Sequence, residues 1–476
     1  MLKYSRTEID FFKSAITTDS EVSPNSKIID WIRARNNDVN IYIEQIPLTK
    51  LSKWELEENT GNIIHESRKF FSIEGIRVHT NWGNVSFWEQ PIINQPEIGY
   101  LGIITKKING VLHFLMQAKI EPGNINVVQI SPTLQATKSN YTQVHKGKKP
   151  LFLEYFNGDK KVIVLLDQLQ SEQGARFLKK RNRNIIVEID KEELNEIPDN
   201  FKWITLGQLK FLLRHDNLVN MDSRTVISGI PFGSYGTETL KYFSALNSRS
   251  SFEESMLISV LNDEIHLHDF NHIISWITRL KSSYELSVEQ IPLNKIINWV
   301  NDGMVIHHEN NKYFSVIGVN VEIDNREVVS WSQPMVKPAQ EGIIAFITKS
   351  INGVYHFLVQ AKLEAGNFDL IELAPTVQCL TGNYRQGLNE YSVPFINDVL
   401  DHTKNKVLYS AMQSEEGGRF YKEQNLNLII EVGDNFPLNV PNNYCWMTFN
   451  QMSKLILFNN YLNIAARSLL SAISFA

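Results

Sequence analysis

Residues Gln117–Asn124 read QAKIEPGN, and the pattern returns 243 positions later, where residues Gln360–Asn367 read QAKLEAGN. The correspondence extends along most of the chain at nearly the same spacing, and it pairs Trp88 with Trp331. A repeat of about 200 residues indicates two copies of a whole domain, because solenoid repeats have much shorter periods.

The self-match divides the chain into four predicted segments. Residues 1–25 form an N-terminal arm, residues 26–230 the first domain, residues 231–267 a connector and residues 268–476 the second domain. The connector opens with a turn-rich run and continues with helical apolar spacing. Each domain is long enough to bury a core of its own.

Hairpin turns are predicted within each copy, because Asn109-Gly110 and Asn352-Gly353 stand between apolar runs. In the strand that follows the first turn, His113, Gln117 and Lys119 share one face, since side chains alternate along a strand. We expect that face to point away from the apolar layer.

Further along, residues 170–177 and 413–420 are predicted to start helices, with a serine as N-cap. The apolar runs at residues 185–188 and 428–431 predict buried strands. Strands interleaved with helices, some joined by hairpins, give an α+β fold in tandem duplicate.

Composition excludes several classes of protein. The 476 residues carry a formal net charge of -5, which is not the basic field of a nucleic-acid binder. No apolar run of about 18 residues predicts a membrane helix, and the N-terminus does not resemble a signal peptide. Two cysteines, Cys379 and Cys445, are predicted to be reduced thiols. We therefore expect a cytoplasmic protein that does not bind nucleic acid or membranes.

The repeated stretch offers a cation and a carboxylate two positions apart, Lys119 and Glu121. One interpretation is a pocket wall in which Lys119 polarises a substrate oxygen and Glu121 moves a proton. The other is a solvent-facing ion pair at the end of a strand.

The loop after this stretch is rich in hydroxyl and amide side chains, and a run of lysines follows it. Such a loop can surround sugar hydroxyls while the lysines meet a pyrophosphate. A solvated surface turn is the alternative. The second copy lacks the lysine run, so the copies differ in charge here.

Two other groups have plain structural explanations. Glu172 and Arg176 could form an i, i+4 ion pair on a helix or point together into a pocket. His266, His268 and His272 lie close together in the connector but lack a recognised metal spacing, so no metal site is expected.

Several motifs in fixed order carry a family resemblance. They are WEQP at residues 88–91, QAKIEPGN at 117–124, SPTLQAT at 131–137, SNY at 139–141 and SEQG at 171–174. With their counterparts in the second copy they resemble the NDP-hexose 2,3-dehydratase family of deoxysugar biosynthesis.

The resemblance implies an enzyme that removes water across C2 and C3 of a nucleotide-linked 4-keto-6-deoxyhexose, usually the dTDP sugar. The product would be a 3,4-diketo-2,6-dideoxy sugar, which a downstream 3-ketoreductase would reduce. No redox or metal cofactor is implied. The resemblance also implies two fused Nudix-like domains per subunit and a homodimer. The destination of the sugar, O-antigen or another glycoside, stays open.

The resemblance also suggests roles for individual residues. Glu121 or Glu172 would be the base, Lys119 the enolate stabiliser and Tyr141 a hydrogen-bond donor or the acid. The first-copy residues expected to bind substrate are Trp88, Gln117, Asn124, Thr133, Gln135, Ser139, Asn140, Lys149 and Arg176. Those of the second copy are Gln360, Lys362, Glu364, Thr376, Gln378, Asn383, Tyr384, Glu415 and Arg419.

The first copy is the favoured catalytic one, because it has both the Pro122-Gly123 turn and the lysine run. The second copy keeps Lys362, Glu364, Tyr384 and Glu415, so it could bind a nucleotide sugar or could itself be the catalytic one. Two other functions remain open at this stage. One is a nucleotide-sugar sensor without turnover. The other is a degenerate Nudix hydrolase, against which the missing Arg-Glu half of the Nudix metal helix argues, since only Glu172-Gln173-Gly174 resembles it.

Overall fold

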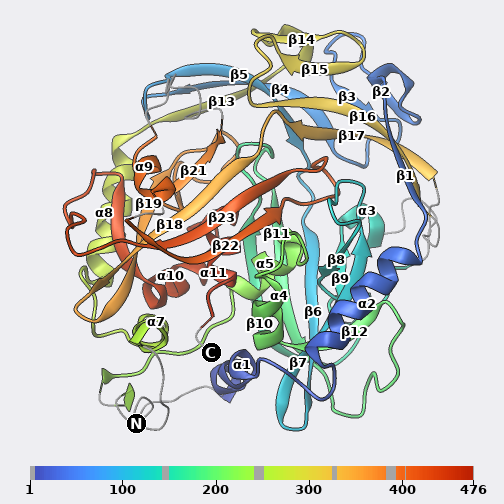
Figure 1. Cartoon of the computed structure of the whole chain (residues 1–476). Coiled ribbons are helices and arrows are strands. Elements are labelled where there is room, and N and C mark those ends of the chain that lie inside the picture. Colours follow the sequence, from blue (N-terminus) through green and yellow to red (C-terminus); the bar gives the residue numbers. More distant parts are fainter. Residues whose placement is uncertain are drawn as a thin grey trace.

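A computed structural model of the chain describes residues 6–141, 149–237, 239–240, 251–323, 330–381, 393–401 and 404–474. We call the residues before position 241 the first half and those after position 250 the second half. Two large sheets lie side by side, and two smaller sheets lie above them (Figure 1). The fold is therefore mixed α and β.

The halves contain similar series of elements. The first half holds α1 (Arg6–Ile16), α2 (Asn25–Asn37), β1 (Ile41–Ile46), β2 (Trp54–Leu56), β3 (Ile63–His65), β4 (Ser72–Thr80), β5 (Phe87–Asn94), β6 (Gly99–Ile108), β7 (Val111–Ile120), β8 (Val128–Ser131), β9 (Leu134–Ala136), α3 (Lys138–Tyr141), β10 (Ile163–Ser171), β11 (Arg181–Glu188), β12 (Phe201–Thr205), α4 (Leu206–Leu212) and α5 (Met221–Ser228). The second half holds α7 (Ser251–Leu261), α8 (Phe270–Ser283), β13 (Leu286–Ile291), β14 (Trp299–Asn301), β15 (Val305–His308), β16 (Phe314–Ile323), β17 (Ser330–Pro338), β18 (Gly342–Ile351), β19 (Val354–Lys362), β20 (Glu372–Ala374), β21 (Val377–Leu380), α9 (Ile396–Leu400), β22 (Lys406–Ser414), β23 (Gln424–Glu431), β24 (Tyr444–Thr448), α10 (Phe449–Ile456) and α11 (Ile464–Ser471).

Each half builds a seven-stranded sheet with the same strand order. The first sheet runs β10-β11-β6-β7-β12, with β8 beside β7 and β9 beside β6. The second runs β22-β23-β18-β19-β24, with β20 beside β19 and β21 beside β18. In both sheets one central pair is parallel, β11 with β6 and β23 with β18. Descent from a duplicated domain and likeness to the Nudix fold stay predictions.

Both predicted hairpins are confirmed. Asn109 and Gly110 have φ of 52° and 74°, and Asn352 and Gly353 have φ of 53° and 77°. They join β6 to β7 and β18 to β19 as antiparallel pairs. Positive φ at both central residues is what a two-residue hairpin requires, and asparagine and glycine tolerate it best.

The smaller sheets exchange strands between the halves. Strand β1 pairs with β16, so that Ile41 lies opposite Ile323. Strand β13 pairs with β4, so that Leu286 lies opposite Thr80. Each five-stranded sheet therefore contains one strand from the other half. This exchange ties the halves into one molecule.

Strand β7 does not have the single polar face that the alternation of its side chains predicted. Phe114 and Met116 are buried in one core and Leu115 in another, so both faces of the strand are covered. His113 is also buried and bonds the Ser20 hydroxyl at 2.9 Å, contrary to the expectation of a polar face. The polar residues near the end of the strand remain available to a pocket.

The helices predicted to begin within residues 170–177 and 413–420 are absent from these described segments. Strands β10 and β22 run to Ser171 and Ser414, and turns follow them. The turn backbones bond other elements instead, as when the Ile93 nitrogen donates to Arg176 oxygen at 2.8 Å. These tertiary hydrogen bonds override the local preference for a helix. The buried strands predicted nearby are confirmed as β11 and β23.

Helices α1 and α7 make equivalent contacts in their halves. The Ser14 hydroxyl donates to Leu112 oxygen at 2.6 Å, and the Ser259 hydroxyl donates to Tyr355 oxygen at 2.5 Å. Part of the predicted arm and part of the predicted connector thus pack on the large sheets. The domain boundaries themselves stay a prediction.

Candidate active site

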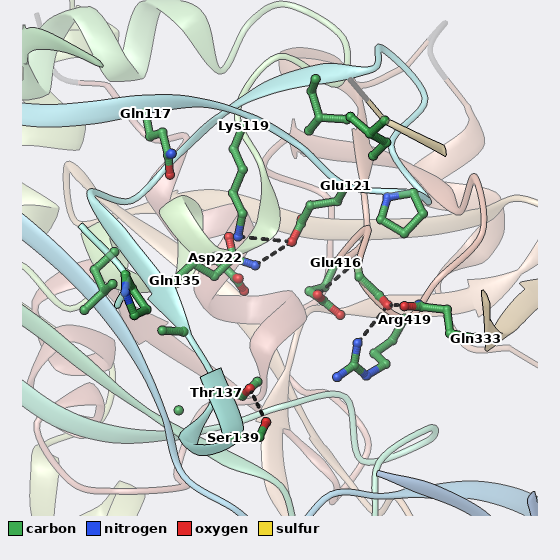
Figure 2. Close-up of a pocket in the computed structure, with 18 of the residues that line it drawn as sticks. Gln117, Lys119, Glu121, Gln135, Thr137, Ser139, Asp222, Gln333, Glu416 and Arg419 are labelled. Carbon is green, nitrogen blue, oxygen red and sulfur yellow. Dashed lines mark hydrogen bonds and ion pairs between the residues drawn. The ribbon is translucent and has the colours of Figure 1, made fainter. Parts of the chain in front are cut away.

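A cavity of about 1050 Å³ lies between the halves. Its walls include the end of β7, the N-terminus of α5 and the turns that follow β10 and β22. Figure 2 shows the polar side chains that converge on it. The first half supplies most of the lining, and the second half adds residues of β17 and of the turn that carries Glu416.

The repeated stretch forms one wall of this cavity. Gln117 and Lys119 lie on β7, and Glu121 follows directly after the strand. The Lys119 Nζ atom lies 3.4 Å from Glu121 Oε1, with only 18% and 7% of the two side chains exposed. Gln135 Nε2 donates to the same oxygen at 2.8 Å. Of the two interpretations of this ion pair, the structure favours the pocket wall.

Gly123 serves the contact between the halves. Its nitrogen donates to Gly417 oxygen at 2.7 Å, and a Cβ atom added to it would lie 1.7 Å from Phe420 oxygen. Gly366 makes the equivalent bond to Gly174 at 2.7 Å. Glycine is needed because the two backbones approach so closely. This contact presents the turn after β22 to the first-half cavity.

That turn brings Glu416 and Arg419 into the cavity. Burial, and then the neighbouring Glu121 carboxylate, raise the pKa of Glu416 to about 7. The Arg419 guanidinium stacks 4.1 Å from the centre of the Phe71 ring. Gln333 Nε2 braces the turn by donating to Gly418 oxygen at 2.7 Å.

Glu172 and Lys180 line another part of the cavity. Glu172 Oε1 accepts a hydrogen bond from Asn182 Nδ2 at 2.7 Å, and burial raises the pKa of Glu172. Burial also lowers the pKa of Lys180 to about 8. With no helix between β10 and β11, the predicted helical pair of Glu172 and Arg176 does not form.

Asp222 is another acid of the cavity, and it lies in the first turn of α5. It is 2% exposed. Burial, followed by the charges of Glu172, Glu416 and Glu121, raises the pKa of Asp222 well above its usual range. Lys119, Glu121, Gln135 and Asp222 point toward one another in Figure 2.

Several predicted first-half residues line the cavity but have structural partners. The Thr133 hydroxyl donates to Leu115 oxygen and accepts from Ile104 nitrogen. Ser139 bonds Glu97 through its nitrogen at 3.1 Å. Both therefore shape the cavity wall more than they offer free groups.

Other predicted residues lie elsewhere. Among the described cavity-lining residues there is no Asn124, Tyr141, Lys149, Trp88 or Arg176. Buried Asn124 bonds Val127 oxygen at 3.0 Å, Tyr141 packs on Tyr100, and exposed Lys149 pairs with Asp159 at 3.5 Å.

Strand exchange explains the placement of Trp88 and Arg176. Trp88 Nε1 donates to Gln90, which braces Ala175 at 3.0 Å, next to Arg176. The carboxylates that act on Arg176 are Glu423, Glu364 and Glu415, all from the second half. Its first-half position thus serves the second half, just as Arg419 serves the first.

The second half repeats the central arrangement. Lys362 Nζ lies 3.6 Å from Glu364 Oε1, and Gln378 Nε2 donates to that oxygen at 3.2 Å. Most of the predicted second-half residues are absent from the described lining of the first-half cavity. These are Gln360, Lys362, Glu364, Thr376, Gln378 and Glu415. Asn383, Tyr384 and the Asn140 side chain lie outside the described part of the chain.

The halves differ in the charged residues at equivalent positions. Asp222 corresponds to Ala465, Glu416 corresponds to Gln173, and Lys180 corresponds to Glu423. Asp222 and Glu416 were missing from the residues predicted to be functional. A comparison of the two copies for acids that only one of them retains could have found both.

The described residues contain no cluster of three or more His, Cys, Asp or Glu side chains arranged to hold a metal ion. They also contain no helix long and apolar enough to cross a membrane.

Buried acids with raised pKa values gather near a lysine in this cavity, an arrangement typical of enzymes that move protons. A family model described as NDP-hexose 2,3-dehydratase matches residues 25–230 and 270–473. The chain belongs to this family and is a dehydratase, a carbon–oxygen lyase of deoxysugar biosynthesis.

Curated relatives support the same assignment over nearly the full length. The dTDP-4-dehydro-6-deoxy-alpha-D-glucopyranose 2,3-dehydratase of Saccharopolyspora spinosa is 44% identical over 97% of this chain and 94% of its own. Its namesakes from Amycolatopsis orientalis and Streptomyces violaceoruber are 39% and 42% identical. They match 97% and 93% of this chain and 93% and 95% of their own.

Proposed function

We propose that the cavity between the halves removes water across C2 and C3 of dTDP-4-dehydro-6-deoxyglucose. The names of the relatives support the substrate. The location of the active site is supported by one observation: Lys119, Glu121, Asp222 and Glu416 converge in this cavity. The second half, by contrast, has Ala465 and Gln173 at the positions equivalent to Asp222 and Glu416.

The chemistry follows from the C4 ketone of the substrate. The ketone acidifies the C3 proton, so a base can remove it and leave an enolate. The C2 hydroxyl, which is β to the carbonyl, then departs. The resulting enol tautomerises to the 3,4-diketo sugar. Such a site needs a base at C3, a cation or donor at the C4 oxygen and an acid at the C2 oxygen.

Glu121 is the proposed base at C3. Its Oε1 atom is fixed by Lys119 and Gln135, while its buried Oε2 atom accepts no hydrogen bond from the described residues. That oxygen is therefore free to take a proton. Lys119 is the proposed partner of the C4 oxygen, because its ammonium group can stabilise the enolate. Arg419 and Lys180 add positive charge that suits a nucleotide diphosphate.

Incubation of the purified protein with dTDP-4-dehydro-6-deoxyglucose tests the proposal. Mass spectrometry should detect a product lighter by one water, and a 3-ketoreductase would trap it in reduced form. If no water is lost while dTDP binds, the proposed substrate is wrong. Lys119→Ala should reduce the rate far more than Lys362→Ala if the first-half cavity is the active one.

Two further parts of the proposal concern partners. We expect a homodimer, which mass photometry can test directly. We also expect a 3-ketoreductase to consume the product, because a vicinal diketone is reactive and its reduction would protect the sugar.

A further inference from the structure

Asp222 reaches the cavity from a helix whose start is firmly held. The Asn220 side chain caps α5 by accepting from Ser223 nitrogen at 2.8 Å. The same side chain donates to Gln135 Oε1 at 3.3 Å, and Gln135 in turn holds Glu121 at 2.8 Å. The position of Asp222 is thus linked to that of the proposed base.

One oxygen of the Asp222 carboxyl group has no bonding partner among the described residues that would explain why an acid stands here. This Oδ1 atom is buried and accepts no hydrogen bond from any described residue. A buried polar atom without a partner costs free energy, so such an atom needs an explanation other than stability.

The second half shows that the fold does not require an acid here. Ala465 holds the equivalent position in the first turn of α11, which Asn463 caps as Asn220 caps α5. Arg467 and Arg224 also occupy equivalent buried positions on the two helices. An alanine satisfies the same local structure, which leaves the carboxyl group of Asp222 to a function of the cavity.

The groups that face Asp222 favour its protonated, neutral form. Glu121 after β7, Glu172 after β10 and Glu416 after β22 all raise its pKa, with burial as the largest cause and Lys119 as the opposing charge. A neutral carboxylic acid beside a base is the arrangement that divides two carboxyl groups into acid and base.

We propose that Asp222 is the catalytic acid that protonates the departing C2 hydroxyl, an assignment that rests on the proposed function. Glu121 takes the C3 proton, and the electrons of the C3–H bond form the enolate. The C2–O bond then breaks, and the hydroxyl leaves as water with the proton of Asp222. Tautomerisation takes one proton at C2 and releases one from O3. Net transfer of a proton from Glu121 to Asp222 restores the enzyme, and no other reactant is consumed.

The test separates proton removal from departure of the hydroxyl. In deuterium oxide, Asp222→Asn should still exchange the C3 proton of the substrate, while its rate of water loss falls about 10²–10⁴-fold. With a 2-deoxy-2-fluoro analogue the leaving group is fluoride, which departs without general acid. The variant should release fluoride within a few-fold of the unaltered enzyme.

Glu372→Gln is the matched control, because Glu372 is also a buried acid but does not line the cavity. It should retain both reactions. Asp222→Ala is the second variant, and Ala465 indicates that an alanine is accepted at this position of the fold. Thermal unfolding and dTDP binding would establish that each variant is folded.

The outcomes are distinct. If Asp222→Asn loses water release, fluoride release and C3 exchange to the same extent while it binds dTDP, Asp222 is not the acid for the hydroxyl. If it dehydrates at the normal rate, the inference also fails. If the unaltered enzyme dehydrates nothing, it is the proposed function that fails.

Discussion

Single glycines determine how closely the halves approach. Gly123 and Gly366 each donate a backbone hydrogen bond to the other half, at 2.7 Å in both cases. A side chain on either would overlap a carbonyl oxygen, at 1.7 Å from Phe420 and Phe177 respectively. Gly123 thereby brings the turn that carries Glu416 to the cavity, so its effect on chemistry is indirect.

Gly123→Ala should therefore destabilise the protein by about 2–4 kcal/mol, because the backbone must move to relieve the overlap. Gly433→Ala is the matched control, since a Cβ atom there would meet nothing within 4 Å. Urea unfolding monitored by fluorescence measures both. Equal stability of the two variants would show that the loops can separate at no cost.

Glu372 shows how one buried acid makes stability depend on pH. Its Oε2 atom accepts from the Ser171 hydroxyl at 2.7 Å, and burial raises the pKa of Glu372 from 4.5 to about 8. The unfolded chain releases this proton above about pH 4.5, whereas the folded chain keeps it to about pH 8. The contribution of this group to the free energy of unfolding is therefore fully present below pH 4.5 and is lost as the pH rises to 8.

Glu372→Gln should remove that loss. Gln129 holds the equivalent place in the first half and accepts from the Ser414 hydroxyl at 3.0 Å, so an amide fits such a site. The variant should be about 1–3 kcal/mol more stable than the unaltered protein at pH 8 and nearly equal to it at pH 4.5. Chemical denaturation at the two pH values measures the difference. A variant less stable at both would contradict this account.

Among the elements, α5 connects the acids of the cavity. Its cap, Asn220, bonds Gln135, which holds Glu121, and its second residue is Asp222. Arg224 reaches from the same helix to the carbonyl of Ser414, next to the turn that carries Glu416. One short helix thus sets the positions of acids from both halves.

Asn220→Ala tests this role of the helix. Loss of the N-cap should cost about 1 kcal/mol. The freed Gln135 should also lower kcat several-fold. Asn463→Ala removes the equivalent cap of α11 and should cost similar stability with a smaller effect on kcat. Steady-state kinetics beside unfolding curves would separate the two effects, and equal losses of kcat would contradict the account.

Local patterns predicted the elements better than their partners. The Asn-Gly pairs predicted both hairpins, because backbone conformation at these residues depends on nearest neighbours. The helices expected after Gln170 and Gln413 were wrong, because backbone bonds to distant segments decide those turns. The pairing of β1 with β16 could not be predicted, since the apolar pattern of a strand does not specify which strand it joins.

For the candidate site, the predicted first-copy residues Lys119, Glu121 and Gln135 all line the cavity, while their roles stay predictions. The sequence grouped Trp88 and Arg176 with them because these residues share a copy of the repeat. Exchange between the halves places Trp331 and Arg419 in the cavity instead. Asp222 lies about 100 residues beyond the repeated stretch in a buried helix, with no local motif to reveal its role.

At the scale of the whole molecule, the two halves form a single unit whose core is shared. One hydrophobic cluster contains both Phe114 and Phe357, and α5 packs against α11 across the boundary. The exchanged strands β1 and β13 add hydrogen-bonded pairs between the halves. We infer that a duplicated domain gave rise to this arrangement and that its copies later diverged in their acids.

Separate expression of residues 1–245 and 246–476 tests the mutual dependence. Neither fragment should fold alone, because each small sheet lacks a strand and each half exposes its share of the common core. Together they should form a stoichiometric complex by size-exclusion chromatography. A fragment that folds alone with a cooperative thermal transition would show that the halves are independent.

We propose that the first-half cavity, and not its second-half counterpart, performs the dehydration. The most direct measurement compares Glu121→Gln with Glu364→Gln, which alter equivalent glutamates in the two halves, for water loss from dTDP-4-dehydro-6-deoxyglucose by mass spectrometry. We expect Glu121→Gln to slow water loss by at least about 10²-fold and Glu364→Gln to slow it by less than about tenfold. A larger loss in Glu364→Gln than in Glu121→Gln would contradict it.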